Sequence, residues 1–219
     1  MNGFLTRPEI RAAARESLSG KWGKAVAITL IYYAILIAAE MVPLVGSIVS
    51  LLISGAFALG IALYFLGLAR SANPPVATMF EGFRRFGKTL GLYLLIAIFT
   101  FLWMLLLVVP GIIAGYRYSQ AYFILIDNPD IGPLEAIRRS KDMMAGHKWR
   151  LFVLHLSFIG WFLLSLLTLG IGLLWLYPYY MASTAHFYDN LRSLGSSSTS
   201  IGWVPPSPAG YNNPSEPLS

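Results

Sequence analysis

Long apolar stretches, separated by short polar segments, occupy most of the chain. The first stretch covers residues 25–42 and the second covers residues 44–68, with Pro43 and Gly46 marking the break between them. Each has about the 20 residues that a helix needs to cross the hydrocarbon core of a bilayer. The pattern therefore predicts two transmembrane helices that form a hairpin.

The next apolar stretch is too long for one crossing. A single helix over residues 90–126 would be about 55 Å long at about 1.5 Å per residue, whereas the hydrocarbon core is about 30 Å thick. We therefore expect two helices, at residues 90–109 and 112–126, with a tight turn at Pro110 and Gly111.

The last apolar stretch divides near Gly170 and Gly172 into spans at residues 149–169 and 171–187, and the second of these is short and contains Pro178. The predicted fold class is thus all-α. It is a polytopic membrane protein with six transmembrane helices in three hairpins, joined by short cytoplasmic amphipathic helices.

Basic residues lie on one side of this arrangement. Fifteen of the 16 lysines and arginines fall in the N-terminal segment, in the two loops between hairpins, or at Arg192, and Arg117 lies inside a span. The turns around Pro43, Pro110 and Gly170 contain none. Because lysine and arginine collect in short cytoplasmic loops, both termini are expected in the cytoplasm.

Composition supports this interpretation and excludes several classes of protein. The 219 residues are 56% hydrophobic and 12% charged, whereas soluble domains have about 25% charged residues. An ordinary soluble enzyme, a disordered protein and a nucleic-acid-binding module are excluded, despite a net charge of +6. The absence of cysteine excludes disulfides, thiolate metal sites and cysteine nucleophiles.

A basic and aromatic element precedes each hairpin. Its aromatic residues, Trp22, Phe86 and Trp149, are 64 and 63 residues apart and are flanked by lysine or arginine. Constant spacing favours a threefold internal repeat. The alternative is coincidence, because any cytoplasmic helix start attracts basic and aromatic side chains.

Short amphipathic helices are predicted before these elements, at residues 8–18, 79–86 and 133–145. The first has Thr6 and Glu9 at capping-box spacing. The second places Met79, Phe83 and Phe86 on one side. Such helices lie flat on anionic lipid, and the alternative is that they are polar connectors. Residues 1–192 then form an integral membrane domain, followed by a Pro- and Ser-rich, disordered cytoplasmic tail at residues 193–219.

Glu40 and Arg117 are the charged residues inside the predicted spans, and both are expected in the outer part of the membrane at comparable depth. An isolated charge there is costly, so we expect an ion pair between the first and fourth helices. One alternative is a proton or substrate site that includes Tyr116 and Tyr118. Another is that the two charges reach water separately.

Helix packing is predicted along one stripe of the second helix, where small residues recur every four positions. Such a stripe lets two helix backbones approach closely in lipid, and packing within the chain is favoured over a dimer contact. Its members are Gly46, Ser50, Ser54, Ala58 and Ala62.

No catalytic or metal-binding motif is present in the sequence. His155 and His186 have no neighbours at ligand spacing and are expected to be packed side chains. The segment at residues 127–130, Asp-Asn-Pro-Asp, is typical of a helix end followed by a turn. No catalytic residue, metal, cofactor or nucleic-acid partner is therefore expected.

Several segments carry a family resemblance, among them residues 107–119 (LVVPGIIAGYRYS), 127–129 (DNP), 144–152 (MAGHKWRLF), 156–161 (LSFIGW) and 168–172 (TLGIG). Together they resemble the bacterial integral membrane proteins catalogued as domain of unknown function 975, over about residues 1–192. The resemblance implies a multi-pass protein of the bacterial cell membrane with no established activity and no catalytic residues to transfer. His147 departs from the asparagine expected between Gly146 and Lys148, which weakens any functional argument for that position.

A more distant likeness to membrane domains attached to glycerophosphodiester phosphodiesterases implies an accessory role near lipids. The leading hypothesis is a non-enzymatic accessory or scaffold protein whose partners are membrane lipids and an unidentified membrane protein. The alternative is a small transporter or lipid-handling permease that uses the region of Glu40 and Arg117. An enzyme ranks third, since no nucleophile and base are recognisable.

Overall fold

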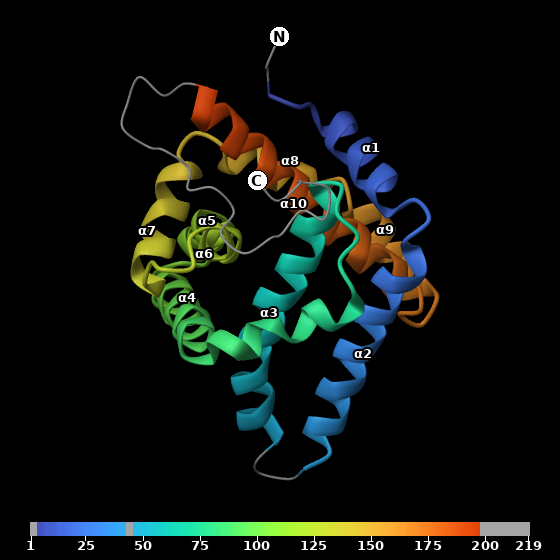
Figure 1. The fold of residues 1–219 in the computed structure, drawn as a ribbon. Helices are drawn as coiled ribbons and strands as arrows, with labels where there is room; N and C mark the ends of the chain where they lie inside the picture. Colours follow the sequence, from blue (N-terminus) through green and yellow to red (C-terminus); the bar gives the residue numbers. More distant parts are fainter. Residues whose placement is uncertain (1–3, 43–45, 198–219) are drawn as a thin grey trace, which may run out of the picture.

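The structure, a computed structural model, describes residues 4–42 and 46–197, with side chains described as far as residue 195. All regular elements in these ranges are helical, which confirms the all-α class (Figure 1). They are α1 (Arg7–Leu18), α2 (Trp22–Glu40), α3 (Gly46–Ala69), η1 (Val76–Arg85), α4 (Phe86–Leu106), α5 (Val108–Tyr118), α6 (Ala121–Asp127), α7 (Pro133–Met143), α8 (Lys148–Leu156), α9 (Ile159–Leu167) and α10 (Leu173–Ser197).

Four helical stretches are long and apolar enough to cross a membrane: Trp22–Glu40, Gly46–Ala69, Val76–Leu106 and Lys148–Leu167. They correspond to the first, second, third and fifth predicted spans. The fourth predicted span is divided between α5 and α6 by a turn at residues 119–120. The sixth lies within α10, which continues through Pro178. Within residues 4–42 and 46–197, the structure therefore shows four candidate membrane helices, and six spans are not shown.

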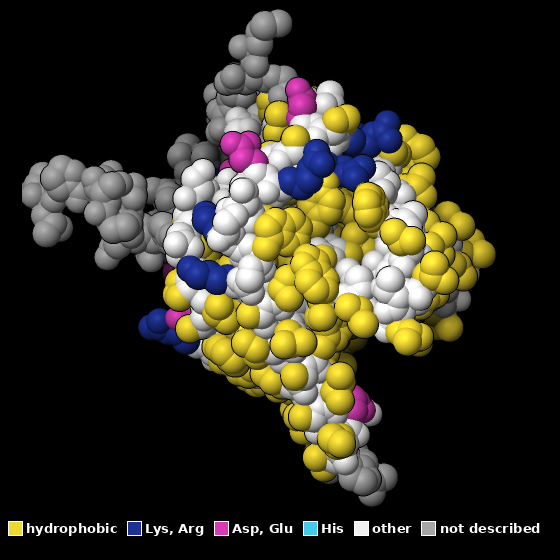
Figure 2. Space-filling model, turned by 90° about the vertical axis from the view of Figure 1, so that its right-hand side faces the viewer, with side chains coloured by type: hydrophobic (Ala, Val, Ile, Leu, Met, Phe, Trp, Pro, Cys, Tyr) yellow, Lys and Arg dark blue, Asp and Glu magenta, His cyan; other side chains and the backbone are white. Residues whose placement is uncertain are grey.

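Large apolar side chains are exposed where the hairpins turn. Met41 is 79% exposed, Leu107 is 65% exposed and Leu167 is 81% exposed. The α2–α3 hairpin projects from the rest of the chain and is covered with hydrophobic side chains (Figures 1 and 2). Contiguous apolar surface of this kind marks contact with a membrane or a partner. It indicates a membrane location.

The turn of the second hairpin lies earlier than the sequence predicts. Leu107, between α4 and α5, is extended, with φ −162° and ψ 144°. Pro110 was predicted in this turn but lies in the first turn of α5, where an N–H group has no partner within the helix and proline is tolerated. Gly111 permits the close return of the chain, because a Cβ there would lie 2.8 Å from Cα of Met104.

The third hairpin turns where the glycines predict it. Gly170 has φ +85°, in the left-handed region that glycine enters without steric cost. A Cβ on Gly172 would lie 2.9 Å from Cα of Ser165 in α9. The prediction of a break near Gly170 and Gly172 is confirmed.

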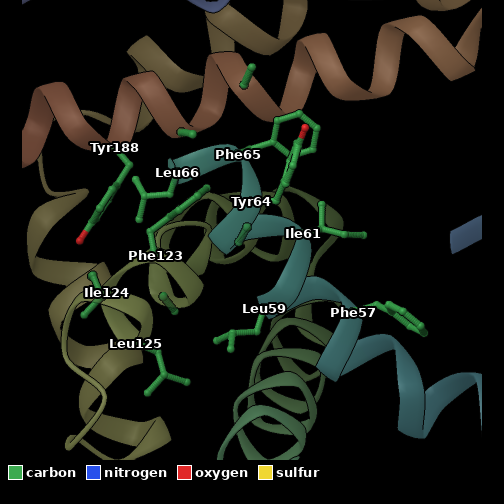
Figure 3. Packing of buried hydrophobic residues seen from close by; sticks show 14 of the residues in the cluster. Phe57, Leu59, Ile61, Tyr64, Phe65, Leu66, Phe123, Ile124, Leu125 and Tyr188 are labelled. Carbon is green, nitrogen blue, oxygen red and sulfur yellow. The ribbon is translucent and has the colours of Figure 1, made fainter. Parts of the chain in front are cut away.

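The second helices of the hairpins form the centre of the fold. In an apolar 18-residue stretch of each candidate membrane helix, 50% of the residues are buried for α3, against 17% for α2, 11% for η1–α4 and 22% for α8–α9. Phe65 of α3, Phe123 of α6 and Tyr188 of α10 belong to one buried cluster (Figure 3). The rings of Phe123 and Tyr188 stack with centroids 5.1 Å apart. The first helices therefore surround a core of α3, α6 and α10.

A short helix precedes each hairpin, in agreement with the predicted repeat: α1 before α2, η1 before α4, and α7 before α8. Trp22 and Phe86 begin α2 and α4, and Trp149 is the second residue of α8. The basic and aromatic elements thus occupy equivalent helix starts.

Helix α1 has the predicted capping box. The backbone N–H and hydroxyl of Thr6 donate to the Glu9 carboxylate at 2.6 Å and 2.7 Å. Ile10, Ala14 and Leu18, four residues apart, are buried. Because α1 packs on α10, protein covers its apolar face. The prediction that this face lies on lipid is therefore wrong.

Helix η1 differs from its predicted pattern because it is a 3-10 helix. With three residues per turn, side chains at positions i and i+3 lie above each other. Phe83 and Phe86 therefore share an exposed face and stack with ring centroids 6.4 Å apart. Met79, predicted on the same side as these rings, is fully buried with Gly82 on the opposite side.

Helix η1 crosses α3 at backbone contact. A Cβ on Gly60 would overlap the carbonyl of Met79, and a Cβ on Gly82 would overlap the carbonyl of Ala56. Glycine is thus required on both sides of the crossing. At the other end of the chain, α10 continues to Ser197, so residues 193–197 are helical; the remainder of the predicted disordered tail lies outside the described residues.

Candidate functional site

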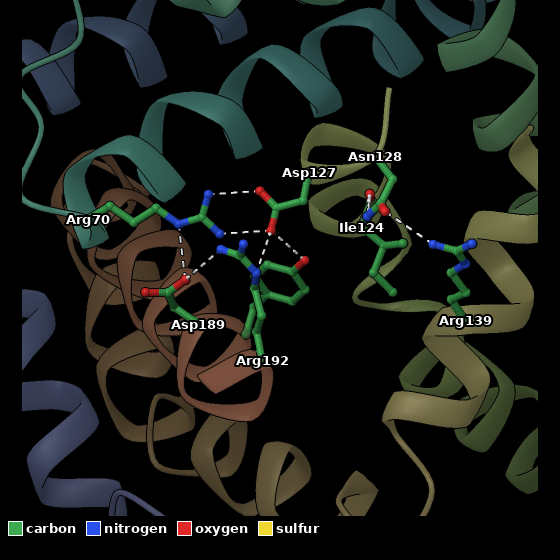
Figure 4. Close-up of polar contacts among 8 residues, drawn as sticks. Arg70, Ile124, Asp127, Asn128, Arg139, Asp189 and Arg192 are labelled. Atoms are coloured by element: carbon green, nitrogen blue, oxygen red, sulfur yellow. Dashed lines mark hydrogen bonds and ion pairs between the residues drawn. The ribbon is translucent and has the colours of Figure 1, made fainter. Parts of the chain in front are cut away.

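A cluster of charged side chains lies where α3, α6 and α10 meet (Figure 4). Arg70 follows the last residue of α3, and its Nη1 and Nη2 donate to the two carboxylate oxygens of Asp127, both at 2.8 Å. Its Nε donates to Oδ1 of Asp189 at 3.0 Å. We call Arg70, Asp127, Tyr188, Asp189 and Arg192 the interhairpin cluster, since its members come from all three hairpins.

Two further side chains of α10 complete the interhairpin cluster. The hydroxyl of Tyr188 donates to Oδ2 of Asp127 at 2.8 Å, and Nε of Arg192 lies 3.4 Å from the same oxygen. The Asp127 side chain is 4% exposed. A charge buried this deeply is stable only when it is paired and hydrogen-bonded, and here two arginines face two aspartates.

Two members of the interhairpin cluster, Arg70 and Tyr188, keep their protons at neutral pH. Burial lowers the pKa of the Arg70 guanidinium, but hydrogen bonds and the charges of Asp127 and Asp189 outweigh burial and raise it above the usual value. Burial, followed by the charge of Asp127, raises the pKa of Tyr188 well above its usual value. Arg70 therefore stays charged and Tyr188 keeps the proton that it donates.

A second network fastens the end of α6 to α7. Asn128 Nδ2 donates to the carbonyl of Ile124 at 2.9 Å, and Nη1 of Arg139 donates to Oδ1 of Asn128 at 3.1 Å. Nε of Arg139 also donates to Glu135 at 2.8 Å. The helix end predicted at residues 127–130 is confirmed, because α6 ends at Asp127.

Sequence reasoning missed the interhairpin cluster, because it treated Arg70, Asp127 and Arg192 only as polar ends of apolar spans. The sequence contained one signal for the interhairpin cluster, its threefold repeat. Arg70 and Asp127 lie at the ends of the second helices in successive hairpins, and a threefold repeat places equivalent ends together.

The structure does not bring Glu40 and Arg117 together. Glu40 is exposed at the end of α2 and accepts a hydrogen bond from Ser47 at 3.3 Å. Arg117 is half-buried near the end of α5, without an ion pair in the described part of the chain. Since the turn lies at Leu107, Arg117 is about 15 Å along the helix from it at 1.5 Å per residue. Within the described residues no ion pair joins the two side chains, so the expected ion pair does not form.

The tyrosines beside Arg117 diverge. The ring of Tyr116 contacts Phe152 of α8 with centroids 5.8 Å apart, whereas Tyr118 contacts Phe99 of α4 at 6.2 Å. Each residue of an α-helix turns the side-chain direction by about 100°, so Tyr116 and Tyr118, two positions apart, point to nearly opposite sides of α5. The four predicted polar residues therefore do not converge on one site.

The small-residue stripe of α3 faces other parts of the chain. Gly46 and Ala62 are buried, and the members between them, Ser50, Ser54 and Ala58, are half-buried. A Cβ on Gly46 would lie 2.6 Å from the carbonyl oxygen of Ala39 in α2. The stripe lies on packed surface, but the closest backbone crossing of α3 is with η1.

The histidines of the hairpins are packed side chains. Nδ1 of His155 lies 3.4 Å from the hydroxyl of Tyr180, and Nε2 of His186 lies 3.1 Å from the hydroxyl of Ser17. Within residues 4–42 and 46–195, no three histidine, aspartate or glutamate side chains are grouped for metal binding.

Two open cavities lie beside basic helix starts. One, of about 490 Å³, is lined by residues of α1, α8 and α10 and by the segment before α1. The other, of about 500 Å³, is lined by Arg84, Arg85 and Lys88 together with Asp130. Both contain cationic side chains that the interhairpin cluster does not use.

Comparison with known proteins identifies the family. A family described as "Protein of unknown function (DUF975)" matches residues 1–113 and 104–195. These matches cover most of the chain, so the protein belongs to this family, and the resemblance seen in the sequence is confirmed. No curated protein and no solved structure matches the chain.

Proposed function

We propose that this protein is a non-enzymatic accessory or scaffold protein of the bacterial plasma membrane, with six membrane-spanning helices and both termini in the cytoplasm. The interhairpin cluster carries the proposal. Its two arginines and two aspartates bind one another, and Tyr188 donates to the most deeply buried carboxylate. A site for substrate turnover needs a polar group left available for the substrate, whereas a closed cluster holds three hairpins in one arrangement.

The charge distribution supports six crossings. Arg70 directly follows α3, Asp127 is the last residue of α6, and Asp189 lies in the second half of α10. Because basic residues collect in cytoplasmic loops, we propose that the interhairpin cluster lies at the cytoplasmic side. The α5–α6 segment, 20 residues in all, and α10 then supply the two crossings beyond the four long apolar helices.

Cysteine labelling tests the topology, since the chain has no native cysteine. Met41→Cys, Leu107→Cys and Leu167→Cys, one at each hairpin turn, should react with an impermeant maleimide on intact cells. Ser19→Cys, exposed after α1, should react only after permeabilisation. Protection of Leu107→Cys in intact cells would exclude a crossing by the second hairpin.

Photo-crosslinking tests the scaffold role. A photoreactive phenylalanine analogue is placed at Ile37, Phe101 or Phe162, which are exposed on the outer helices of the three hairpins. A scaffold should give a discrete protein crosslink from at least one hairpin, and the remaining positions serve as matched controls. Crosslinking to lipid alone from all three positions would contradict the proposal.

A small transporter is the second candidate, and it is favoured by Arg117, which is half-buried and has no ion pair among the residues that the structure describes. A transport pathway would make this position accessible to water from one side. In the scaffold, Arg117→Cys should be as unreactive toward a charged thiosulfonate as Tyr118→Cys, whose native side chain is 8% exposed. Fast modification of Arg117→Cys alone would favour transport.

A further inference from the structure

The cavity of about 490 Å³ lies between the start of α1, the start of α8 and α10, which are adjacent in Figure 1. Its volume falls within the range of about 300–1,000 Å³ that is typical of small-molecule sites. Its walls combine cationic and apolar side chains, among them Phe4, Arg7, Pro8, Trp149, Arg150 and Phe187.

Arg150 supplies the strongest evidence for a ligand. Its Nη2 donates to the carbonyl of Leu5 at 2.8 Å, and its guanidinium lies over the ring of Phe4, 4.2 Å from the centroid. Its Nη1 is buried without a hydrogen-bond partner in the described part of the chain. An unpaired buried N–H is unfavourable, and an anionic oxygen would satisfy it.

Arg7 adds a second positive charge at the first residue of α1. It is exposed, and no ion pair or hydrogen bond of its side chain is present within residues 4–42 and 46–195. No acidic residue lines the cavity; Glu9, on the same helix turn, is engaged by Thr6. Among the described residues, the cavity therefore presents two guanidinium groups without a counter-ion, and guanidinium groups bind phosphate through paired hydrogen bonds.

The remaining walls match the apolar part of a lipid. Trp149 is 71% exposed and stacks on Phe152 with centroids 5.1 Å apart. It lies at the start of Lys148–Leu167, one of the four candidate membrane helices, where tryptophan is typical of the headgroup level. Large apolar side chains of α9, in the same candidate membrane helix, are also exposed, among them Trp161, Phe162 and Leu163.

We infer that this cavity binds the phosphate group of an anionic glycerophospholipid, with Arg7 and Arg150 holding the phosphate and Trp149 lying beside the glycerol and acyl chains. Basic pockets at the cytoplasmic end of membrane helices bind anionic headgroups in this way. The second cavity is a weaker candidate, because Asp130 lines it, Lys88 donates to the carbonyl of Pro129, and Arg84 pairs with Glu81.

Native mass spectrometry of the delipidated full-length protein in neutral detergent tests this inference. Titration with phosphatidylglycerol should show one lipid retained at low micromolar concentration, and phosphatidylcholine should bind at least about tenfold more weakly. Arg7→Gln and Arg150→Gln should each weaken phosphatidylglycerol binding by about tenfold or more, as expected for loss of a charge-assisted hydrogen bond. Arg15→Gln removes the same charge from an exposed position of α1 outside the cavity and should leave binding unchanged.

Arg7→Gln keeps the test decisive if loss of the Leu5 contact prevents Arg150→Gln from folding, because within residues 4–42 and 46–195 the Arg7 side chain makes no hydrogen bond or ion pair that the substitution would remove. Equal effects of Arg7→Gln and Arg15→Gln would show nonspecific attraction and overturn the inference. Inorganic phosphate at 100-fold excess should fail to displace the lipid, since it lacks the apolar part. Displacement would overturn the assignment to a lipid in favour of a free phosphate ligand.

Discussion

Asp127→Asn is the most direct perturbation of the interhairpin cluster, because it removes the charge that Arg70 and Arg192 share while preserving the size of the side chain. Removing one partner of a buried ion pair costs about 3–5 kcal/mol. The side chains of Arg70 and Arg192 are 25% and 19% exposed, so they regain some hydration, and the amide oxygen still accepts one hydrogen bond. We therefore expect the lower end of this range, about 3 kcal/mol.

For a protein of this size, about 1 kcal/mol corresponds to about 2–4 °C in the unfolding temperature, so Asp127→Asn should lower that temperature by about 6–12 °C. Tryptophan fluorescence during thermal unfolding in detergent measures the shift, with size-exclusion chromatography to check that the starting sample is monodisperse. Asp189→Asn is the matched control. The Asp189 side chain is 33% exposed, and more exposed pairs contribute about 0–1 kcal/mol.

A double variant separates the charge from the packing. Arg70→Met with Asp127→Leu removes both partners and leaves no unpaired charge at either position, so it should unfold at a higher temperature than Asp127→Asn alone. Equal shifts for Asp127→Asn and Asp189→Asn would refute the reasoning. A double variant less stable than the single variant would do the same.

Other features make separate predictions. Gly60→Ala should destabilise the protein by about 3 kcal/mol in thermal unfolding, because its Cβ overlaps the Met79 carbonyl, whereas Gly23→Ala, with no atom within 4 Å of its Cβ, should not destabilise. Thr6→Ala should cost about 1 kcal/mol and speed amide hydrogen exchange in the first turn of α1; unchanged exchange would contradict the capping role. Burial and a neighbouring guanidinium lower the pKa of His147, so protonation is less favourable in the folded state. The folded state is therefore most stable, as far as His147 is concerned, above the pKa of about 6.5 that this side chain has in the unfolded protein. This contribution to stability declines as the pH falls below that value. Wild-type protein should lose more thermal stability between pH 7 and pH 5.5 than His147→Asn, and equal losses would exclude this contribution.

The family description assigns no activity. The scaffold proposal and the lipid-binding proposal therefore rest on the structure alone, and each rests on a different part of the molecule. The interhairpin cluster joins helix ends through charges that satisfy one another. The cavity inferred to bind lipid has two guanidinium groups, Arg7 and Arg150, without counter-ions in the described part of the chain. A scaffold that fails to bind lipid, or a lipid-binding protein without a protein partner, would separate the two proposals experimentally.

Local patterns predicted most of the individual helices. Apolar runs of about 20 residues located α2, α3, α4 and α8–α9, since membrane helices have that length. The capping box located the start of α1, and Gly170 located the third turn. Pro110 was misplaced because proline suits both a turn and the first turn of a helix. Phe83 and Phe86 share a face as predicted, but Met79 was assigned to the wrong face because a 3-10 helix repeats every three residues.

Contacts between hairpins required the tertiary structure. Arg70 is 57 residues from Asp127 and 119 from Asp189, and helix periodicity carries no information on which helix ends meet at such separations. Glu40 and Arg117 were expected to pair at one depth, but Glu40 is the last residue of α2, whereas Arg117 lies about 15 Å along its helix from the turn at Leu107. The sequence specifies where helices begin and which faces are apolar, because these depend on neighbouring residues. Only the packing of α3, α6 and α10 decides which charges pair, because burial makes pairing necessary and the fold supplies the partner.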